Sequence, residues 1–283
     1  MVNLDKISFI GCGNMASAII HGLIANGLAA ANILASNRGQ KKLEVIKHST
    51  GIQITTDNIK AVNFSDILIL AVKPQILPQV CQQLSCIDLS NKLIISIAAG
   101  ITTDKISQLC NQKSPNQESY NQELSIVRAM SNTPATVSEA ATGLYANSKT
   151  SASQKIQATK IFDAIGLSQW VEKESLIDVI TAIAGSSPAY VFLFIQAMVD
   201  QAVKQGLEAT TARKLATQAV LGASKLAQKQ SDQSLENLQK AVTSPGGTTA
   251  AAIDSFEQDD FSNIIKKAVA AAITKGKELG EQT

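Results

Sequence analysis

Residues 6–27 of the chain read KISFIGCGNMASAIIHGLIANG. An apolar run, residues 7–10, comes first, glycines follow it at once, and a helical apolar repeat then continues to about Gly27. A strand, a glycine-rich turn and a helix in this order open the domains that bind dinucleotides. Gly11 permits the tight turn, Gly13 lets the backbone approach a pyrophosphate, and Ala16 lets the helix pack against the strand. We therefore predict that this segment begins a nicotinamide dinucleotide-binding domain.

The start of this helix supplies the binding groups. N–H groups of a first helical turn have no partner within the helix, so they bind phosphate oxygens readily. An ordinary turn is the alternative for a glycine pair taken alone, but the position between a first strand and a first helix favours the dinucleotide. Cys12 is interpreted as a small residue tolerated in the loop, with a redox switch as the alternative. The residues predicted to bind the cofactor here are Ile10, Gly11, Cys12, Gly13, Asn14 and Met15.

Short aliphatic runs continue to alternate with amphipathic stretches as far as about residue 144. The further runs lie at 33–35, 52–54, 67–72, 93–97 and 126–130. This alternation is typical of a mostly parallel sheet covered by helices, with ligand-binding loops at the carboxyl ends of the strands. After Trp170 the strand-like runs cease and only helical patterns follow. We therefore predict an α/β Rossmann-like N-terminal domain, residues 1–171, and an all-α C-terminal domain for dimerisation and substrate binding, residues 172–283.

Composition excludes several classes of protein. The chain has 283 residues, 45% of them apolar, and its formal charge of +2 is too small for a nucleic-acid-binding protein. No segment approaches the run of about 18 apolar residues that spans a membrane, and no basic region precedes the first apolar run. The four cysteines lack the spacing of a zinc site or a disulfide framework. We expect a cytoplasmic protein without a metal, acting on a small molecule, with an exposed polar loop at 108–123.

The second strand ends at the place where NAD-specific proteins usually carry an acid for the ribose hydroxyls. Ser36, Asn37 and Arg38 stand there instead, with no acid among them. Hydrogen-bond donors and a fixed cation suit a 2′-phosphate, so we predict NADPH as the cofactor, with NADH as the alternative. Arg38 could also be a solvated charge beside Lys41 and Lys42.

Two further loops should border the nicotinamide half of the cofactor. Pro74 stops the fourth strand and can begin a helix, and the fifth strand ends in small residues that let a flat ligand approach. Lys73 has a plain surface lysine as its alternative reading. The cofactor residues predicted in these loops are Ala71, Val72, Lys73, Pro74, Ile97, Ala98 and Ala99.

The helical region contains apolar surface that a lone surface helix cannot have. Residues 190–195 are apolar on every face, so they lie either at the centre of the domain or against a second subunit. The small residues at 268–272 would let helices approach closely. Because a helical domain of this length needs so much burial, we predict a homodimer.

One segment interrupts the helical pattern, residues 242–250, which read VTSPGGTTA. Pro245 and two glycines end one helix, and Ser244, Thr248 and Thr249 surround the start of the next. A helix start of this kind binds carboxylates through its N–H groups, and an elaborate N-cap between two helices is the alternative.

These segments together resemble the pyrroline-5-carboxylate reductase family, which catalyses the last step of proline biosynthesis. The resemblance rests on FIGCGNMA at 9–16, AVKP at 71–74, RAMSNTP at 128–134, GSSPAY at 185–190 and SPGGTT at 244–249. It covers nearly the whole chain, and the last motif is the most specific. Family members usually have glycine where Ser187 stands, and the 108–123 loop looks longer than usual.

The resemblance implies reduction of 1-pyrroline-5-carboxylate to L-proline by a Rossmann-like domain and a helical domain that interlocks with a partner, within larger rings of dimers. It implies that Thr249 is catalytic, with its hydroxyl near the ring nitrogen, and that Asn58 lies near the adenosine half of the cofactor. Glu172 corresponds to a position near the ligand, although Lys173 and Glu174 leave that alignment open by a residue. The implied substrate-binding residues are Ser244, Gly246, Gly247, Thr248, Thr249 and Glu172.

The scarcity of acid–base residues agrees with this chemistry. His21 and His48 are the only histidines, and both lie in helical patterns of the first domain. A carbonyl reductase normally needs a tuned His or Lys, whereas a cyclic imine protonated on its ring nitrogen is already an electrophile for hydride. Reduction of a six-membered imine is a second hypothesis, and a dinucleotide sensor without turnover is a third.

Overall fold

The computed structural model describes residues 4–112 and 122–281. The chain forms two compact units, Met1–Ser186 with Ala272–Thr283, and Ser187–Ala271. Most of the polar 108–123 segment lies outside the described residues, so its prediction as a loop stays a prediction.

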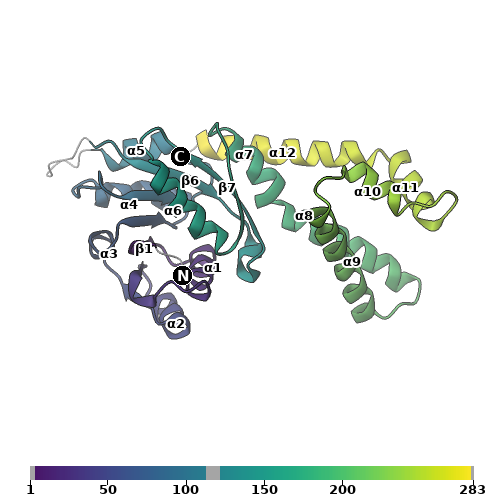
Figure 1. The fold of residues 1–283 in the computed structure, drawn as a ribbon, viewed down its shortest axis with the longest axis horizontal. Coiled ribbons are helices and arrows are strands. Elements are labelled where there is room, and N and C mark those ends of the chain that lie inside the picture. The colour runs from purple at the N-terminus through teal and green to yellow at the C-terminus, as the bar shows by residue number, and fades with distance from the viewer. Residues whose placement is uncertain (1–3, 113–121, 282–283) are drawn as a thin grey trace. The chain divides into compact units, whose positions relative to one another are not determined.

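The first unit is built on one eight-stranded sheet with the order β3-β2-β1-β4-β5-β6-β7-β8 (Figure 1). Strands β1 to β6 are parallel, β7 is antiparallel to β6, and β8 is parallel to β7. The strands are β1 (Ile7–Ile10), β2 (Ile33–Ser36), β3 (Gln53–Thr55), β4 (Ile67–Leu70), β5 (Leu93–Ser96), β6 (Ser125–Met130), β7 (Ala140–Ala146) and β8 (Gly166–Trp170). The direction of strand order reverses between β1 and β4, and α/β sheets bind ligands at such a switch point.

Helices cover both faces of this sheet. The helices of the first unit are α1 (Asn14–Ala25), α2 (Gln40–Thr50), α3 (Asn58–Phe64), α4 (Leu77–Leu84), α5 (Thr103–Cys110), α6 (Ala152–Asp163) and α7 (Leu176–Ile180). Short 3₁₀ turns lie at Ala30–Asn32, Pro74–Ile76 and Thr133–Val137, and a π-helical turn, η4, lies at Thr181–Gly185.

The aliphatic runs form strands because both faces of the sheet are buried. Strands β1, β2, β4 and β5 are buried along their whole length, which requires near-continuous apolar residues. Alternate side chains point to opposite faces: Phe9 lies in the core cluster with α1, α2 and α6, and Ile10 lies in the cluster with α3, α4 and α5. The buried hydroxyl of Ser8 is satisfied by Ser65 Oγ at 2.6 Å.

The Rossmann-like prediction is confirmed, and the sheet is larger than the six predicted runs. Strands β7 and β8 were not among them, because AATGLYA and GLSQW contain glycine, alanine and polar residues and no long β-branched run. The last strand ends at Trp170, where the strand-like pattern was predicted to stop. The compact first unit nevertheless continues to Ser186, since α7 packs on β6 and β7.

The second unit consists of helices alone: α8 (Ser187–Lys204), α9 (Ala209–Lys229), α10 (Leu235–Ala241), α11 (Thr248–Gln258) and α12 (Phe261–Glu281), whose last turns belong to the first unit. Within residues 187–271 Ala212 alone is buried, at 3% exposure. Phe192 and Leu193 are 66% and 74% exposed, so residues 190–195 do not lie at the centre of their own unit. Of the two alternatives, burial against another subunit agrees with this exposure.

The helical stretch Leu176–Lys204 is long and apolar enough to cross a membrane by length and composition. This corrects the expectation that no segment approaches such a span. A window of 18 residues within the stretch has a mean hydropathy of 1.6, although the stretch contains Asp178 and Asp200. A helix buried inside a soluble assembly meets the same criterion.

Candidate active site

The phosphate loop leads from β1 directly into α1. Gly13 is the N-cap residue of α1, it makes no side-chain capping bond, and the first turn contains no acidic residue. An anion at this end would therefore meet backbone N–H groups and the positive end of the helix dipole, with no carboxylate to repel it. The chemistry of this donor set fits a pyrophosphate held by Gly13, Asn14 and Met15.

Gly11 makes the tight turn that brings three strand ends together. Its φ of +101° is unfavourable for other residues, and an added Cβ would lie 2.7 Å from the carbonyl oxygen of Ala71. The Gly11 N–H donates to the Ser36 carbonyl at 2.8 Å, and the Ala71 N–H donates to the Ile10 carbonyl at 2.8 Å. The predicted cofactor residues after β1, β2 and β4 thus lie at one edge of the sheet.

At the end of β2 a chain of side-chain hydrogen bonds runs toward α4. The buried Ser36 hydroxyl donates to Asn58 Oδ1 at 2.7 Å, and Asn58 Nδ2 donates to Gln83 Oε1 at 2.9 Å. Arg38 is exposed, and its guanidinium donates to Gln79 Oε1 at 2.6 Å. The structure therefore joins Ser36 to Asn58 directly and links Asn58 and Arg38 to the same helix, α4. Gln79 and Gln83 also belong to this group of side chains. The sequence reasoning missed them, although their spacing of four residues in a helix places them on one face.

Asn37 joins the loop after β2 to the phosphate loop. Its Oδ1 accepts a hydrogen bond from the Cys12 N–H at 3.4 Å, and its Nδ2 donates to the Gly39 carbonyl at 3.0 Å. Cys12 is 5% exposed, and burial raises the pKa of its thiol, an effect that nearby Lys42 opposes. A buried, protonated thiol is a poor nucleophile, which supports the interpretation of Cys12 as a packing residue.

The loops after β4 and β5 lie beside each other at the same edge. The Ile97 N–H donates to the Leu70 carbonyl at 3.1 Å, and the Ala98 N–H donates to Ser96 Oγ at 3.3 Å. Pro74 begins the 3₁₀ turn that leads into α4, as predicted for a strand stop. Lys73 and Ala99 are exposed, so their side chains are accessible to a ligand.

A buried arginine organises the neighbouring part of this edge. Arg128 on β6 is 3% exposed, and it contacts Asp178 at 2.7 Å and Glu174 at 3.6 Å. Glu174 also accepts hydrogen bonds from the N–H and hydroxyl of Thr103, at 2.7 and 3.0 Å. The sequence reasoning missed both acids, although a buried arginine in a strand motif requires an acidic partner. Glu172 is exposed two residues earlier, outside these contacts.

The predicted substrate loop lies in the second unit, between α10 and α11. Gly247 is the N-cap residue of α11, without a side-chain capping bond or an acid in the first turn. Gly246 has a φ of +71°, and the Gly247 N–H donates to the Ser244 carbonyl at 3.0 Å. Ser244, Thr248 and Thr249 are exposed around this helix start. The start of α11 therefore has no side-chain cap.

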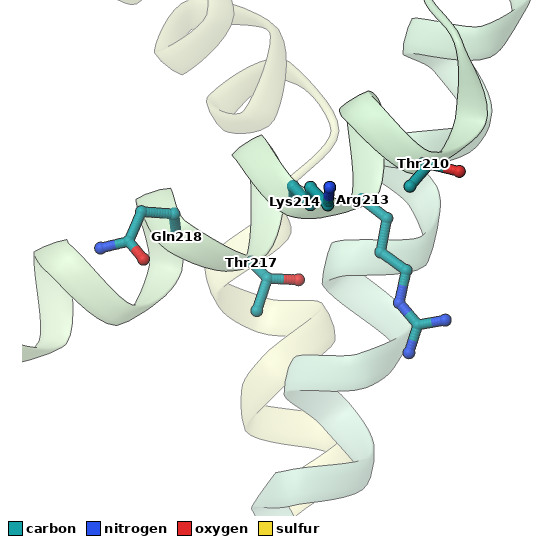
Figure 2. Close-up of a pocket in the computed structure, with 5 residues that line it drawn as sticks. All are labelled: Thr210, Arg213, Lys214, Thr217 and Gln218. Atoms are coloured by element: carbon teal, nitrogen blue, oxygen red, sulfur yellow. The ribbon is translucent and has the colours of Figure 1, made fainter.

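A shallow cavity of about 480 Å³ lies elsewhere in the second unit, along α9. Figure 2 shows that its lining comes from one helix, with two cations and no acid. Every lining side chain is exposed, and none was predicted as a site residue. The lining residues are Thr210, Arg213, Lys214, Thr217 and Gln218.

Comparison with known proteins places both regions in described families. Residues 174–279 match the family model for pyrroline-5-carboxylate reductase dimerisation, and residues 6–100 match the model for NADP oxidoreductase, coenzyme F420-dependent. The helical region is therefore a homo-oligomerisation region, as the exposure of residues 190–195 indicates.

Several relatives that match nearly the whole chain are pyrroline-5-carboxylate reductases. The pyrroline-5-carboxylate reductase of Vibrio alginolyticus is 40% identical over 97% of both chains. A solved pyrroline-5-carboxylate reductase from Coxiella burnetii is 40% identical and superposes with a TM-score of 0.89, over 98% of this chain and 99% of that one. The structure of Plasmodium falciparum pyrroline carboxylate reductase with NADP bound is 32% identical, with a TM-score of 0.84 and 98% of each chain covered. The chain belongs to the pyrroline-5-carboxylate reductase family.

Proposed function

We propose that this protein reduces 1-pyrroline-5-carboxylate to L-proline by hydride transfer from NADPH, the last step of proline biosynthesis. The observation that carries the proposal is that two helices of this family member begin at a glycine loop without a side-chain cap. One of them, at α1, suits a pyrophosphate, and the other, at α11, suits a carboxylate.

NADPH is the preferred cofactor in this proposal, and NADH is the second donor. Ser36, Asn37 and Arg38 present donors and a cation where an acid would favour an unphosphorylated ribose. Asn58 holds Ser36 from the neighbouring helix. The NADP-bound relative from Plasmodium falciparum supports the same choice. When bound, the cofactor supplies the hydride.

The substrate carboxylate binds at the start of α11. N–H groups of the first turn and the hydroxyls of Ser244 and Thr248 hold it, with Gly246 and Gly247 allowing close approach. Thr249 lies one position into the helix, where its hydroxyl can meet the ring nitrogen. Glu172 contributes at the substrate from the loop after β8. These roles come from the resemblance and from the geometry of this loop.

The chain's own residues orient the substrate and do not provide a tuned acid or base. A ring nitrogen that carries a proton makes its carbon electrophilic, so holding that carbon against the hydride donor is the main task. Fixing the carboxylate and the nitrogen together positions the ring for hydride transfer. The protonated ring nitrogen has no free lone pair, so its N–H donates to the Thr249 hydroxyl oxygen, and this bond keeps the nitrogen in place while its bond to carbon becomes single.

The assembly follows from the helical unit. We propose that residues 172–283 form the substrate and dimerisation domain, that residues 1–171 form the dinucleotide domain, and that the protein is a cytoplasmic homodimer within a ring of dimers. The exposed apolar side chains of α8 would be covered in this assembly.

Steady-state kinetics of the purified protein test the proposal. NADPH oxidation should require 1-pyrroline-5-carboxylate, and the product should be L-proline. A panel containing the six-membered homologue separates the two imines, since one methylene changes discrimination by about 1 to 3 kcal/mol. A folded preparation that binds NADPH but turns over no cyclic imine would overturn the proposal and favour a dinucleotide sensor.

A further inference from the structure

Two polar bridges connect the loop after β2 with one face of α4. The first runs from buried Ser36 through Asn58 to Gln83, and the second runs directly from Arg38 to Gln79. Gln79 and Gln83 are four residues apart in one helix, so the two bridges leave α4 side by side. The helix that follows β4 therefore holds two polar side chains from the opposite side of the switch point.

The bridges differ in how firmly they are anchored. Ser36 is fully buried, which fixes the first bridge at its strand end. Arg38 and Gln79 are both exposed, and in the second bridge the Gln79 amide oxygen orients the Arg38 guanidinium by accepting its hydrogen bond. A long exposed arginine otherwise samples many rotamers, and ordering it on a ligand costs conformational entropy.

The neutrality of the Gln79 side chain matters as much as its position. An amide accepts the hydrogen bond without neutralising Arg38, so the cation retains its full charge for a ligand. The start of α2 adds positive potential nearby, because its first turn has no acidic residue and contains Lys41 and Lys42. An acid at position 79 would form an ion pair with Arg38 and repel any second anion.

We propose that Gln79 is a positioning residue for cofactor choice: it orients the Arg38 guanidinium to bind the 2′-phosphate of NADPH and does not neutralise the charge of that guanidinium. This inference rests on the proposed function and extends it to a residue in α4. The donor set fits that group, since Asn37, Arg38 and the start of α2 follow β2 within residues 37–42 and no carboxylate is among them.

Direct binding to the full-length protein tests the role without depending on turnover. The probes are adenosine 2′,5′-bisphosphate and adenosine 5′-monophosphate, which differ by the 2′-phosphate, and titration calorimetry gives the ratio of their dissociation constants. Gln79→Glu should reduce the preference for the bisphosphate by about fivefold, the scale of an exposed ion pair. Gln79→Met, which keeps length and loses the acceptor, should reduce it by about threefold. In the enzyme the same variants should raise the KM for NADPH and leave kcat unchanged.

Gln82→Glu is the matched control, because it places the same charge on α4 at an exposed position outside both bridges. It should leave the ratio within about twofold of wild type. In an Arg38→Ala background, Gln79→Met should have no further effect, which shows that the amide at position 79 acts through the arginine.

Two results would overturn the inference, and they are distinguishable. If wild type prefers the bisphosphate and both Gln79 variants keep that preference, the positioning role is wrong while the cofactor assignment stands. If wild type shows no preference between the probes, the assignment of NADPH fails as well. An undiminished effect of Gln79→Met without Arg38 would exclude action through the arginine.

Discussion

At the scale of single residues, the chemistry rests on a few positions that tolerate little change. Gly11 combines a positive φ with an added-Cβ distance of 2.7 Å to a carbonyl oxygen, so both the backbone angle and the space require glycine. Gly13 differs, since a Cβ there would meet no atom within 4 Å. Its lack of a side chain leaves room beside the start of α1, where a pyrophosphate would bind.

Thr249→Ala should lower kcat/KM for the pyrroline by about ten- to a hundredfold and leave NADPH binding unchanged. A hydrogen bond to a charged group contributes about 1.5 to 3 kcal/mol, and the hydroxyl is exposed at the start of α11, in the unit that does not contain the phosphate loop. Steady-state kinetics and NADPH titration measure the two quantities.

Thr249→Ser, which keeps the hydroxyl, should retain most of the activity and serves as the control. Equal loss of turnover and cofactor binding in the alanine variant would show that Thr249 has a structural role instead.

At the scale of elements, the helices differ in how their first turns are capped. Side-chain caps occur at α3, α5, α6, α9 and α10, from Asp57, Thr102, Ser151, Glu208 and Ser234. Helices α1, α2 and α11 begin at glycine without such a cap. An uncapped helix start leaves N–H groups for water or a ligand, and the starts of α1 and α11 are the proposed phosphate and carboxylate sites.

The Arg128 network joins β6 to α5 and α7, so its loss should destabilise the first unit. Arg128→Met should lower the free energy of unfolding by about 3 kcal/mol, because it leaves two largely buried acids without their cation. Urea unfolding measures the change. Lys149→Met removes an exposed ion pair with Glu123 and should cost less than about 1 kcal/mol. Similar costs for the two variants would contradict a supporting role of Arg128.

Glu208 caps α9 and should make the start of that helix sensitive to acid. Hydrogen bonds from the N–H groups of Thr210 and Thr211 lower the pKa of Glu208 from 4.5 to about 2. Because the folded pKa is depressed, the stabilisation is complete above pH 4.5 and is lost as the pH falls toward 2.

The destabilisation caused by Glu208→Gln should therefore shrink between about pH 6 and about pH 3, as measured by hydrogen exchange at the start of α9. A difference that stays constant over this range would show that the carboxylate is not the cap.

At the scale of the whole molecule, the helical unit does not bury a core of its own. Residues 187–271 contain one buried residue, Ala212, while Phe192 and Leu193 on α8 are largely exposed. Large exposed apolar side chains mark an interaction surface, and the family model identifies the region as a dimerisation region. Oligomerisation and folding of this unit are thus expected to be coupled.

Leu193→Glu should break the assembly into monomers, since a charge buried in an apolar interface is not solvated. Sedimentation velocity measures the change in mass, and cofactor binding by the first unit should persist. Val45→Glu makes the same change at an exposed site on α2 of the first unit and should leave the assembly intact. An unchanged mass for Leu193→Glu would place the interface on another face.

Local patterns accounted for much of this molecule. The alternation of aliphatic runs and helices predicted six strands of the sheet, because strands buried on both faces must be apolar throughout. Glycines at 11 and 13 predicted the phosphate loop, since few other sequences permit that turn. Strands β7 and β8 were not predicted, because their alanine, glycine and polar residues show no periodic apolar pattern.

Contacts between distant segments needed the tertiary structure. Three features are local, since backbone geometry limits which residues can form them: the segment 6–27, the positions of the first six strands along the chain, and the glycine loop at 244–249. The bonds from Arg38 to Gln79 and from Arg128 to Glu174 and Asp178 join residues about 40 to 50 positions apart. Side-chain partners of this kind depend on how helices and strands pack, and no spacing along the chain encodes that packing.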